Sequence, residues 1–143
     1  HSLSLLSRFN GHCRVFYSVA EHSVRVSHAV PAQDALWGLM HDAAEAYLSD
    51  LPRPVKRECP WFREVEDGLL RVIAQAFALP WPPPGSVREA DDRLLATEAR
   101  DLMGPAPQPW RLTAEPYPEP IVPLGPDVAE QAFLSRFAEL RPA

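Results

Sequence analysis

The positions of its 17 prolines limit this chain more than any other feature of its sequence. A proline inside a helix removes a backbone donor and clashes with the preceding turn, so helices must lie between prolines or begin at one. Pro31 therefore ends one helical segment, and Pro60 suits the first position of another. The run 80–85 holds four prolines and predicts a rigid connector. From 104 to 126 prolines recur throughout, which excludes a regular helix or a central strand there.

Two capping boxes mark helix starts in the windows between these prolines. In a capping box a serine bonds the backbone N–H three residues on, where a Glu side chain reaches back. Ser18 with Glu21 opens the first segment, and Ser86 with Glu89 opens one that runs to about Met103. The inward positions of the first segment are Val19, His22, Val26 and Ala29.

Further segments show the helical period. One runs from about 33 to 48 and is rich in Ala, Leu and Met, another begins at Pro60, and a last amphipathic helix begins at Pro126. Their apolar positions include Phe62, Val65, Leu69, Leu70, Ile73 and Phe77 after Pro60, and Ala129, Phe133, Phe137 and Leu140 after Pro126. No alternating strand pattern competes with them, so we expect an all-α fold.

The length of 143 residues and the 46% apolar content suit one compact domain with a single core. We expect a helical core over 1–103, a Pro-rich segment over 104–126 and a C-terminal helix over 127–143. The Pro-rich segment is either a disordered linker or an extended stretch lying against the domain. Its apolar residues favour the second interpretation; these are Trp110, Tyr117, Ile121 and Val122.

The charge balance and the cysteines narrow the class of protein. The net charge of −5 argues against a nucleic-acid or membrane-surface protein. No apolar run is long enough to span a bilayer, and we expect no secretory leader. Cys13 and Cys59 lie far apart without paired spacing. We therefore expect no disulfide framework or zinc knuckle, and a reducing cytoplasmic location. The sequence leaves open whether the protein is a homo-oligomer.

The segment around His41 brings polar groups into an apolar helix. On a continuous helix Trp37, His41, Glu45 and Leu48 share one face, with Asp42 at its edge. Burying these groups without partners would be costly. A divalent cation accepts neutral imidazole and carboxylate together and would compensate for that cost. The plain alternative is an ordinary His–Asp pair.

Two other helices present candidate ligands. His22 lies on the apolar stripe of its segment, where the alternative is a core histidine with satisfied hydrogen bonds. Helical phase turns Asp91 inward and Asp92 toward solvent. The residues four and three positions before Asp92, on its own face, are the charged Arg88 and Glu89. The residues that flank Asp91 at helical spacing are Val87, Ala90, Leu94 and Leu95. One shared cation would explain all three inward faces.

The order His, His-Asp, Asp on three helices resembles the HD superfamily of metal-dependent phosphohydrolases, over about residues 1–103. The stretch 41–56, HDAAEAYLSDLPRPVK, is similar to that of bacterial HD 5′-deoxynucleotidases and of small phage enzymes that remove triphosphate from deoxyadenosine triphosphate. Arg8-Phe9-Asn10, ahead of 19–23, matches the Arg-aromatic element of those families. The resemblance implies a single HD domain that acts on a small-molecule nucleotide.

The resemblance also implies a role for each matched residue. The metal ligands are His22, His41, Asp42 and Asp91, and they would hold one divalent ion (Mn, Co, Zn or Mg). Glu45 and Asp50 are the catalytic acids: either would position the attacking water, and Glu45 would protonate the leaving 5′-oxygen. Candidate phosphate binders are Arg8, Arg53 and Lys56, although Arg53 and Lys56 could equally be solvated loop charges. Phe9 would stack on the sugar or base, unless it is a core residue.

Other kinds of HD protein are the alternatives. Hydrolases of guanosine tetraphosphate carry a Glu-Asp pair after the His-Asp motif, whereas here Glu45 is followed by Ala46. Two-metal phosphodiesterases and di-iron oxygenases use further downstream histidines, and this chain has none after His41. A non-catalytic nucleotide-sensing module stays open, as does a hydrolase of another phosphate ester. Mono- and triphosphates would be cut at the same bond, so the sequence does not separate them.

Overall fold

A computed structural model describes residues 1–108, 110 and 112–141. Over these residues the fold is all-α, as predicted, and the isolated bridge between Ser7 and Ser18 is the only extended pairing described. The α-helices are α1 (Ser2–Leu5), α2 (Val19–Ala29), α3 (Ala35–Met40), α4 (Glu45–Leu48), α5 (Arg53–Arg57), α6 (Pro60–Ala76), α7 (Gly85–Leu102) and α8 (Pro126–Leu140). Two short 3₁₀ turns, Arg8–Gly11 and Ala32–Asp34, complete the elements.

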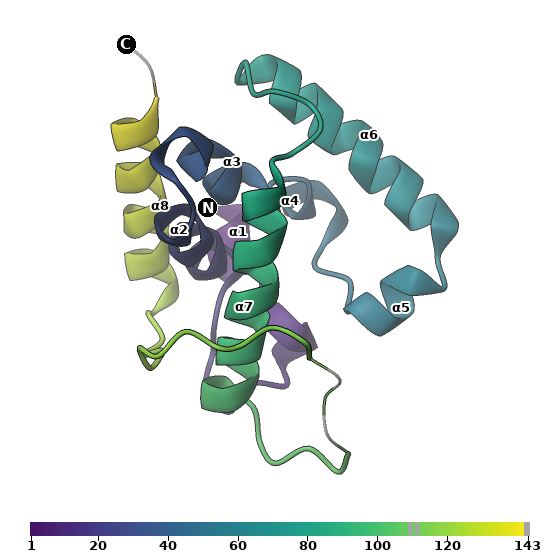
Figure 1. Cartoon of the computed structure of the whole chain (residues 1–143), viewed down its shortest axis with the longest axis vertical. Helices are drawn as coiled ribbons and strands as arrows, with labels where there is room; N and C mark the ends of the chain where they lie inside the picture. The colour runs from purple at the N-terminus through teal and green to yellow at the C-terminus, as the bar shows by residue number, and fades with distance from the viewer. Residues whose placement is uncertain (109, 111, 142–143) are drawn as a thin grey trace.

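Helix α2 is the centre of the bundle, with α3, α7 and α8 packed around it (Figure 1). The serine half of its predicted capping box is confirmed, because the N–H of Glu21 donates to the Ser18 hydroxyl at 3.1 Å. The other half is wrong, because the Glu21 carboxylate binds Arg25 and the N–H of Leu124. Val19 and Val26 are fully buried, as their helical phase predicts. Ala29 is exposed, so its predicted inward position is wrong; it is the last residue of the helix.

The predicted continuous helix over 33–48 is wrong. Helix α3 ends at Met40, and residues 41–44 form tight turns before α4 begins. The N–H groups of Ala43 and Glu45 bond the carbonyls three residues back, at 3.0 Å each. Such 3₁₀-type bonds wind the chain more tightly than an α-helix. The shared face of Trp37, His41, Glu45 and Leu48 is therefore broken between His41 and Glu45.

Helix α7 crosses the front of the bundle in Figure 1 and runs to Leu102, one residue short of its predicted end. The predicted capping box of Ser86 and Glu89 is wrong. The helix begins one residue earlier, at Gly85, and has no side-chain cap. The Ser86 hydroxyl donates instead to the Asp34 carboxylate at 2.6 Å, which ties the start of α7 to the turn before α3.

The described part of the Pro-rich segment lies against the domain, as predicted. The N–H of Tyr117 donates to Thr97, that of Ile121 to Asp101 and that of Leu124 to Glu21, each at 2.8 Å. Ile121 joins the main hydrophobic cluster. Trp110 and Val122, however, are exposed. The segment therefore returns the chain to α2, where α8 packs.

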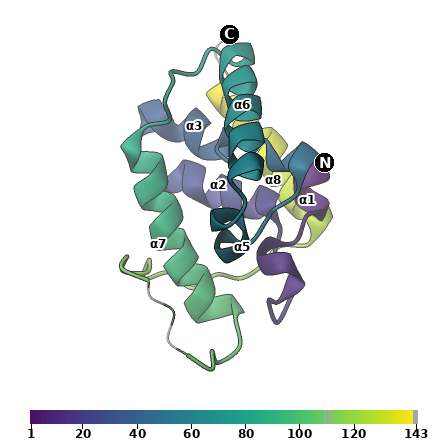
Figure 2. The same ribbon diagram turned by 90° about the vertical axis from the view of Figure 1, so that its right-hand side faces the viewer.

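Helix α6 begins at Pro60 as predicted, and runs along the outside of the bundle (Figures 1 and 2). Its broadest contact with another helix is with the short α5 that precedes it. Ala74 is the one residue of its 17 that is buried. None of the described helices is both long and apolar enough to cross a membrane.

A close approach of α3 to α2 yields a test of this packing. A Cβ added at Gly38 would lie 2.9 Å from the Cα of Ser27, too close for α2 to remain in place. We predict that Gly38→Ala lowers the free energy of unfolding by about 1–3 kcal/mol, because overpacking strains the core. Gly85→Ala, whose Cβ would meet no atom within 4 Å, should change it by less than about 0.5 kcal/mol. Urea unfolding measures both, and equal values would contradict the packing.

Candidate metal centre

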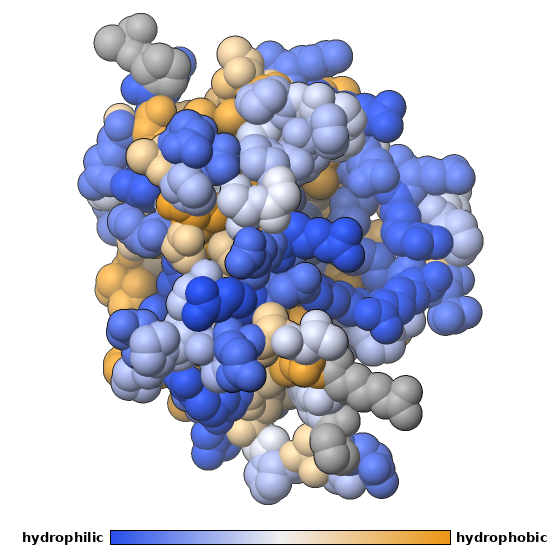
Figure 3. All heavy atoms as spheres, in the orientation of Figure 1, coloured by the Kyte–Doolittle hydropathy of each residue, from blue (hydrophilic) through white to orange (hydrophobic). Residues whose placement is uncertain are grey.

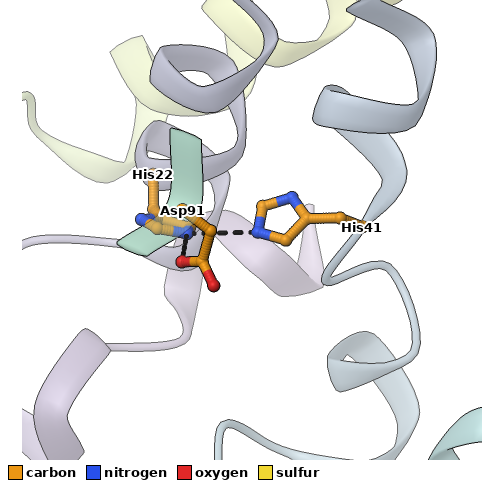
Figure 4. A group of neighbouring side chains, drawn as sticks. All are labelled: His22, His41 and Asp91. Carbon is orange, nitrogen blue, oxygen red and sulfur yellow. Dashed lines mark hydrogen bonds and ion pairs between the residues drawn. The ribbon is translucent and has the colours of Figure 1, made fainter. Parts of the chain in front are cut away.

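Two histidines from different elements face each other inside the bundle. His22 lies in α2 and is fully buried, whereas His41 directly follows α3. Their Nε2 atoms lie 3.2 Å apart. Figure 4 shows the two rings directed toward one another, with the Asp91 carboxylate beside them. His22, His41 and Asp91 each offer one ligand atom within 4.8 Å of the others, an arrangement that could hold a metal ion.

Hydrogen bonds on the far side of each ring determine which nitrogen carries the hydrogen. Nδ1 of His22 lies 2.6 Å from the Glu98 carboxylate, and Nδ1 of His41 lies 2.8 Å from the carbonyl oxygen of Gly38. Because a carboxylate and a carbonyl only accept, each Nδ1 is the donor. In the neutral rings both Nε2 lone pairs then point into one small space. That arrangement favours a cation between them.

Two aspartates complete the cluster. Oδ1 of Asp91 lies 3.2 Å from Nε2 of His22. Oδ2 of Asp42 lies 3.3 Å from Nε2 of His41 and 3.6 Å from Nε2 of His22. His41 and Asp42 are consecutive in the chain, and the tight turn after α3 brings both side chains to the same cluster. Two imidazole nitrogens and two carboxylates form a donor set that suits a divalent transition metal.

The phase of α7 agrees with the sequence at the neighbouring aspartates. Asp91 is directed at the histidines, while the Asp92 side chain is 42% exposed. Arg53 on α5 binds both of them, one with each terminal nitrogen. Hydrophilic side chains cover this face of the molecule over α7 and α5 (Figure 3). Asp91 therefore links the histidine cluster to the charged surface.

Burial and the neighbouring charges act against each other on the titratable groups of the cluster. Burial and Arg8 lower the pKa of His22, but Glu98 and Asp91 outweigh them and raise it to about 9. Burial raises the pKa of Asp42, yet His41 and other nearby cations hold it well below its usual range. Burial also raises the pKa of Asp91, but its hydrogen bond to His22 and the charge there outweigh burial and lower it. The surrounding charges thus hold an added positive charge at His22 and keep both aspartates ionised.

The two predicted catalytic acids lie beside this cluster. Glu45 is 3% exposed, and its Oε2 atom is buried without a hydrogen-bond partner in the described structure. Burial and the charges of Asp42 and Asp50 raise the pKa of Glu45 to about 10, so the carboxyl is protonated at neutral pH. Burial also raises the pKa of Asp50. A buried neutral carboxyl can donate a proton, which is what a general acid requires.

Arg8 is buried against three carboxylates. Its guanidinium lies 3.1 Å from Glu98, 3.4 Å from Asp42 and 3.9 Å from Asp50. Its Nε atom is buried without a partner among the described residues. A backbone hydrogen bond holds Arg8 beside these carboxylates: its N–H donates at 2.9 Å to the carbonyl of Tyr17, which lies just before α2 in the chain. Arg8 is therefore part of the cluster.

The other predicted substrate residues lie around Arg8 and α5. Phe9 is half-buried, with φ of 54°, and its ring packs 5.9 Å from that of Trp110. Lys56 lies 2.7 Å from Glu66 and 3.7 Å from Glu45. A cavity of about 320 Å³ opens next to Arg8, and its walls include Gly11 and Tyr17. The four candidate ligands do not line it.

Sequence reasoning missed Glu98, the residue that connects the two halves of the site. It is fully buried and binds both His22 and Arg8. Arg8 and His22 hold its pKa below its usual range against the effect of burial. The sequence does indicate that Glu98 points inward, because it follows Asp91 by seven residues and shares its helical face with Leu94 and Leu102. Extending the phase argument by two turns identifies it.

Comparison with known proteins identifies relatives but gives no activity. No family model matches the chain. The uncharacterized protein YfdR of Escherichia coli (strain K12) is 42% identical over 142 residues, which cover 97% of this chain and 80% of YfdR. The chain belongs to the YfdR family. Another uncharacterized protein, RCAP_rcc00048 of Rhodobacter capsulatus, is 34% identical over 100 residues, covering 63% of this chain and 51% of that protein.

The match to YfdR extends beyond the candidate ligands. With 97% of the chain aligned, the Pro-rich segment and α8 belong to what the two YfdR-family proteins share. In this chain the segment is fixed partly through Glu21, whose carboxylate accepts from the N–H of Leu124 and binds Arg25. Glu21 immediately precedes His22. The C-terminal third therefore supports the helix that carries a candidate ligand.

The two buried glutamates provide a matched test of the site. Glu98→Gln keeps an oxygen for His22 but removes the charge and places an amide N–H₂ against Arg8. We predict that Mn²⁺ affinity falls by about 10–100-fold, the usual effect of disturbing a ligand's outer hydrogen bond. Glu21→Gln, equally buried, should lower stability and leave the affinity unchanged. Titration calorimetry of the folded variants measures this, and equal losses of affinity in both would refute the role of Glu98.

Proposed function

We propose that this chain is a divalent-metal-dependent phosphohydrolase of the HD type, which cleaves the 5′-phosphate ester of (deoxy)nucleotides. It would act either as a 5′-deoxynucleotidase or as a deoxynucleoside triphosphate triphosphohydrolase. The observation that supports this most strongly is the pair of Nε2 atoms 3.2 Å apart, with a carboxylate on each side. Without a metal ion this space is satisfied by a proton on His22, whose pKa is raised to about 9; a bound divalent ion would take the place of that proton.

The residues present fit the metal that this function needs. His22, His41, Asp42 and Asp91 would hold one divalent ion, with Mn, Co, Zn and Mg as candidates. When bound, such an ion lowers the pKa of water and screens phosphate charge. Glu98 and the Gly38 carbonyl fix the ring orientation of the two histidines, which improves a histidine as a ligand.

Glu45 and Asp50 have environments that suit two different tasks. Glu45 is protonated and has a free buried oxygen, so it can donate its proton to the leaving 5′-oxygen of the nucleoside. The Asp50 side chain is 14% exposed, and Arg8 and Lys56 oppose the effect of burial on its pKa. It can accept a proton from the attacking water. Acid and base then belong to separate carboxyls.

The cations around the site would receive the phosphate. Arg8, Arg53 and Lys56 each bind a carboxylate of the cluster or of its edge. A phosphate oxygen offers the same charge-assisted contacts and can replace a carboxylate as the partner of a guanidinium. Arg53 and Lys56 are therefore assigned to phosphate binding together with Arg8. Phe9, next in sequence to Arg8, would pack on the sugar or base.

The cellular setting follows from the proposed substrate. Nucleotide pools are cytoplasmic, and Cys13 and Cys59 are both free thiols, as their spacing predicted. A cytoplasmic enzyme would keep them reduced. The substrate is a free nucleotide, since the net charge of −5 disfavours binding to a nucleic acid.

A nucleotide panel tests the proposal directly. We expect the purified protein with Mn²⁺, Co²⁺ or Zn²⁺ to release a deoxynucleoside from deoxynucleoside mono- or triphosphates. The second product identifies the subclass, because a 5′-deoxynucleotidase releases phosphate and a triphosphohydrolase releases triphosphate. Activity should disappear in a chelator and return with metal. Turnover that persists in thorough chelator, or no turnover of any nucleotide with metal bound, would contradict the proposal.

Glu45→Gln separates the acid from the ligands. The amide has the shape of the protonated carboxyl but cannot give up a proton as an acid. Metal content should therefore be unchanged while turnover falls by about 10²–10⁴-fold. His41→Ala should lose metal and activity together. Metal analysis beside the rates measures both. A metal-free Glu45→Gln protein would make Glu45 a ligand, and a fully active one would make it a bystander.

A further inference from the structure

Helix α6 carries two apolar faces, and the bundle covers only one of them. The inner face includes Ala74, which is buried. Just after the helix, the ring of Phe77 lies 5.5 Å from that of Phe137 on α8. A second set of small and apolar residues follows the helix at spacings of four, three, four and four residues. This outer stripe consists of Trp61, Val65, Gly68, Val72 and Ala76.

The outer stripe is open to solvent except at Val65, which is half-buried. Trp61 is 69% exposed and Val72 is 60% exposed. A Cβ added at Gly68, midway between them, would meet no atom within 4 Å. Single exposed apolar residues are ordinary, but a stripe that includes a largely exposed tryptophan marks an interaction surface. Figure 1 shows α6 at the right-hand side of the molecule and Figure 2 shows it in front of the bundle, where another protein can reach it.

The spacing of the stripe matches the seam of a pair of helices. Residues 61, 65, 68 and 72 follow the alternating d and a positions of a heptad, and the 17 residues of α6 extend about 25 Å. Glu64 and Arg71 then occupy successive g positions on one flank. Arg71 lies over the ring of Trp81 at 5.1 Å. Neither Glu64 nor Arg71 forms an ion pair within the described residues.

We propose that α6 pairs in antiparallel orientation with α6 of a second copy of this chain, through the outer stripe. A two-fold axis near Gly68 brings the two glycines together, which allows close approach of the backbones. In an antiparallel pair the g flanks meet, so Glu64 of each copy lies near Arg71 of the other. The pairing therefore gains two opposite-charge contacts. In a parallel pair the g positions would face the partner's e positions, which are Leu69 and Ala76, so these opposite-charge contacts would be lost.

Pairing would also steady α5, since Lys56 on α5 binds Glu66 on α6.

Charge reversal tests the pairing and its orientation. Light scattering at about 50 µM should give twice the chain mass of 16.0 kDa for the wild type. Glu64→Arg and Arg71→Glu should each weaken self-association by about tenfold or more, because each creates two like-charge contacts. The double variant should restore the dimer. A monomeric wild type, or a double variant no better than the single ones, would overturn the proposal.

A matched pair of valines tests the location. Val72→Glu places a charge in the outer stripe and should yield a monomer. Val128→Glu makes the same exchange on α8, where the valine is 55% exposed, and should leave the dimer intact. Circular dichroism verifies that both remain helical. A dimer that survives Val72→Glu, or that Val128→Glu dissociates, would place the interface elsewhere.

Discussion

The contact between the Nε2 atoms of His22 and His41 is the constraint on which the rest of the site depends. Two imidazole lone pairs at 3.2 Å repel, so the pair needs a positive charge between them, either a proton on His22, whose pKa is raised to about 9, or a metal ion. Glu98 and the carbonyl of Gly38 prevent either ring from avoiding this by changing its tautomer. Asp42 and Asp91 then add negative charge to the same space. A bound cation relieves this arrangement, and the proposed chemistry follows from it.

The bundle is arranged around that constraint. Helix α2 supplies His22, the end of α3 supplies His41, and α7 supplies Asp91 and Glu98. Gly38 serves twice, because its missing side chain lets α3 approach Ser27 closely while its carbonyl orients His41. The Pro-rich segment contributes indirectly by binding Glu21, the residue before His22. Parts of the chain that are distant in sequence thus hold the candidate ligand atoms together.

The fold class and much of the site could be predicted from the sequence, because helical periodicity and proline positions are local signals. The phase of α7 correctly separated Asp91 from Asp92. The break after Met40 could not be predicted, since alanine-rich residues favour a helix and only tertiary packing imposes the tight turns. The prediction that Ser86 caps α7 was wrong for the same reason, because Asp34, which is distant in sequence, accepts a hydrogen bond from its hydroxyl. Glu98 was within reach of the same phase argument that found Asp91.

The central claim is that these side chains surround one cation, and anomalous diffraction from crystals grown with zinc tests it most directly. One strong peak is expected between the two rings. It should lie about 2.0–2.1 Å from Nε2 of His22 and of His41, and about 2.0–2.2 Å from an oxygen of Asp42 and of Asp91. Clear density for both rings with no peak between them, in crystals saturated with zinc, would contradict the account.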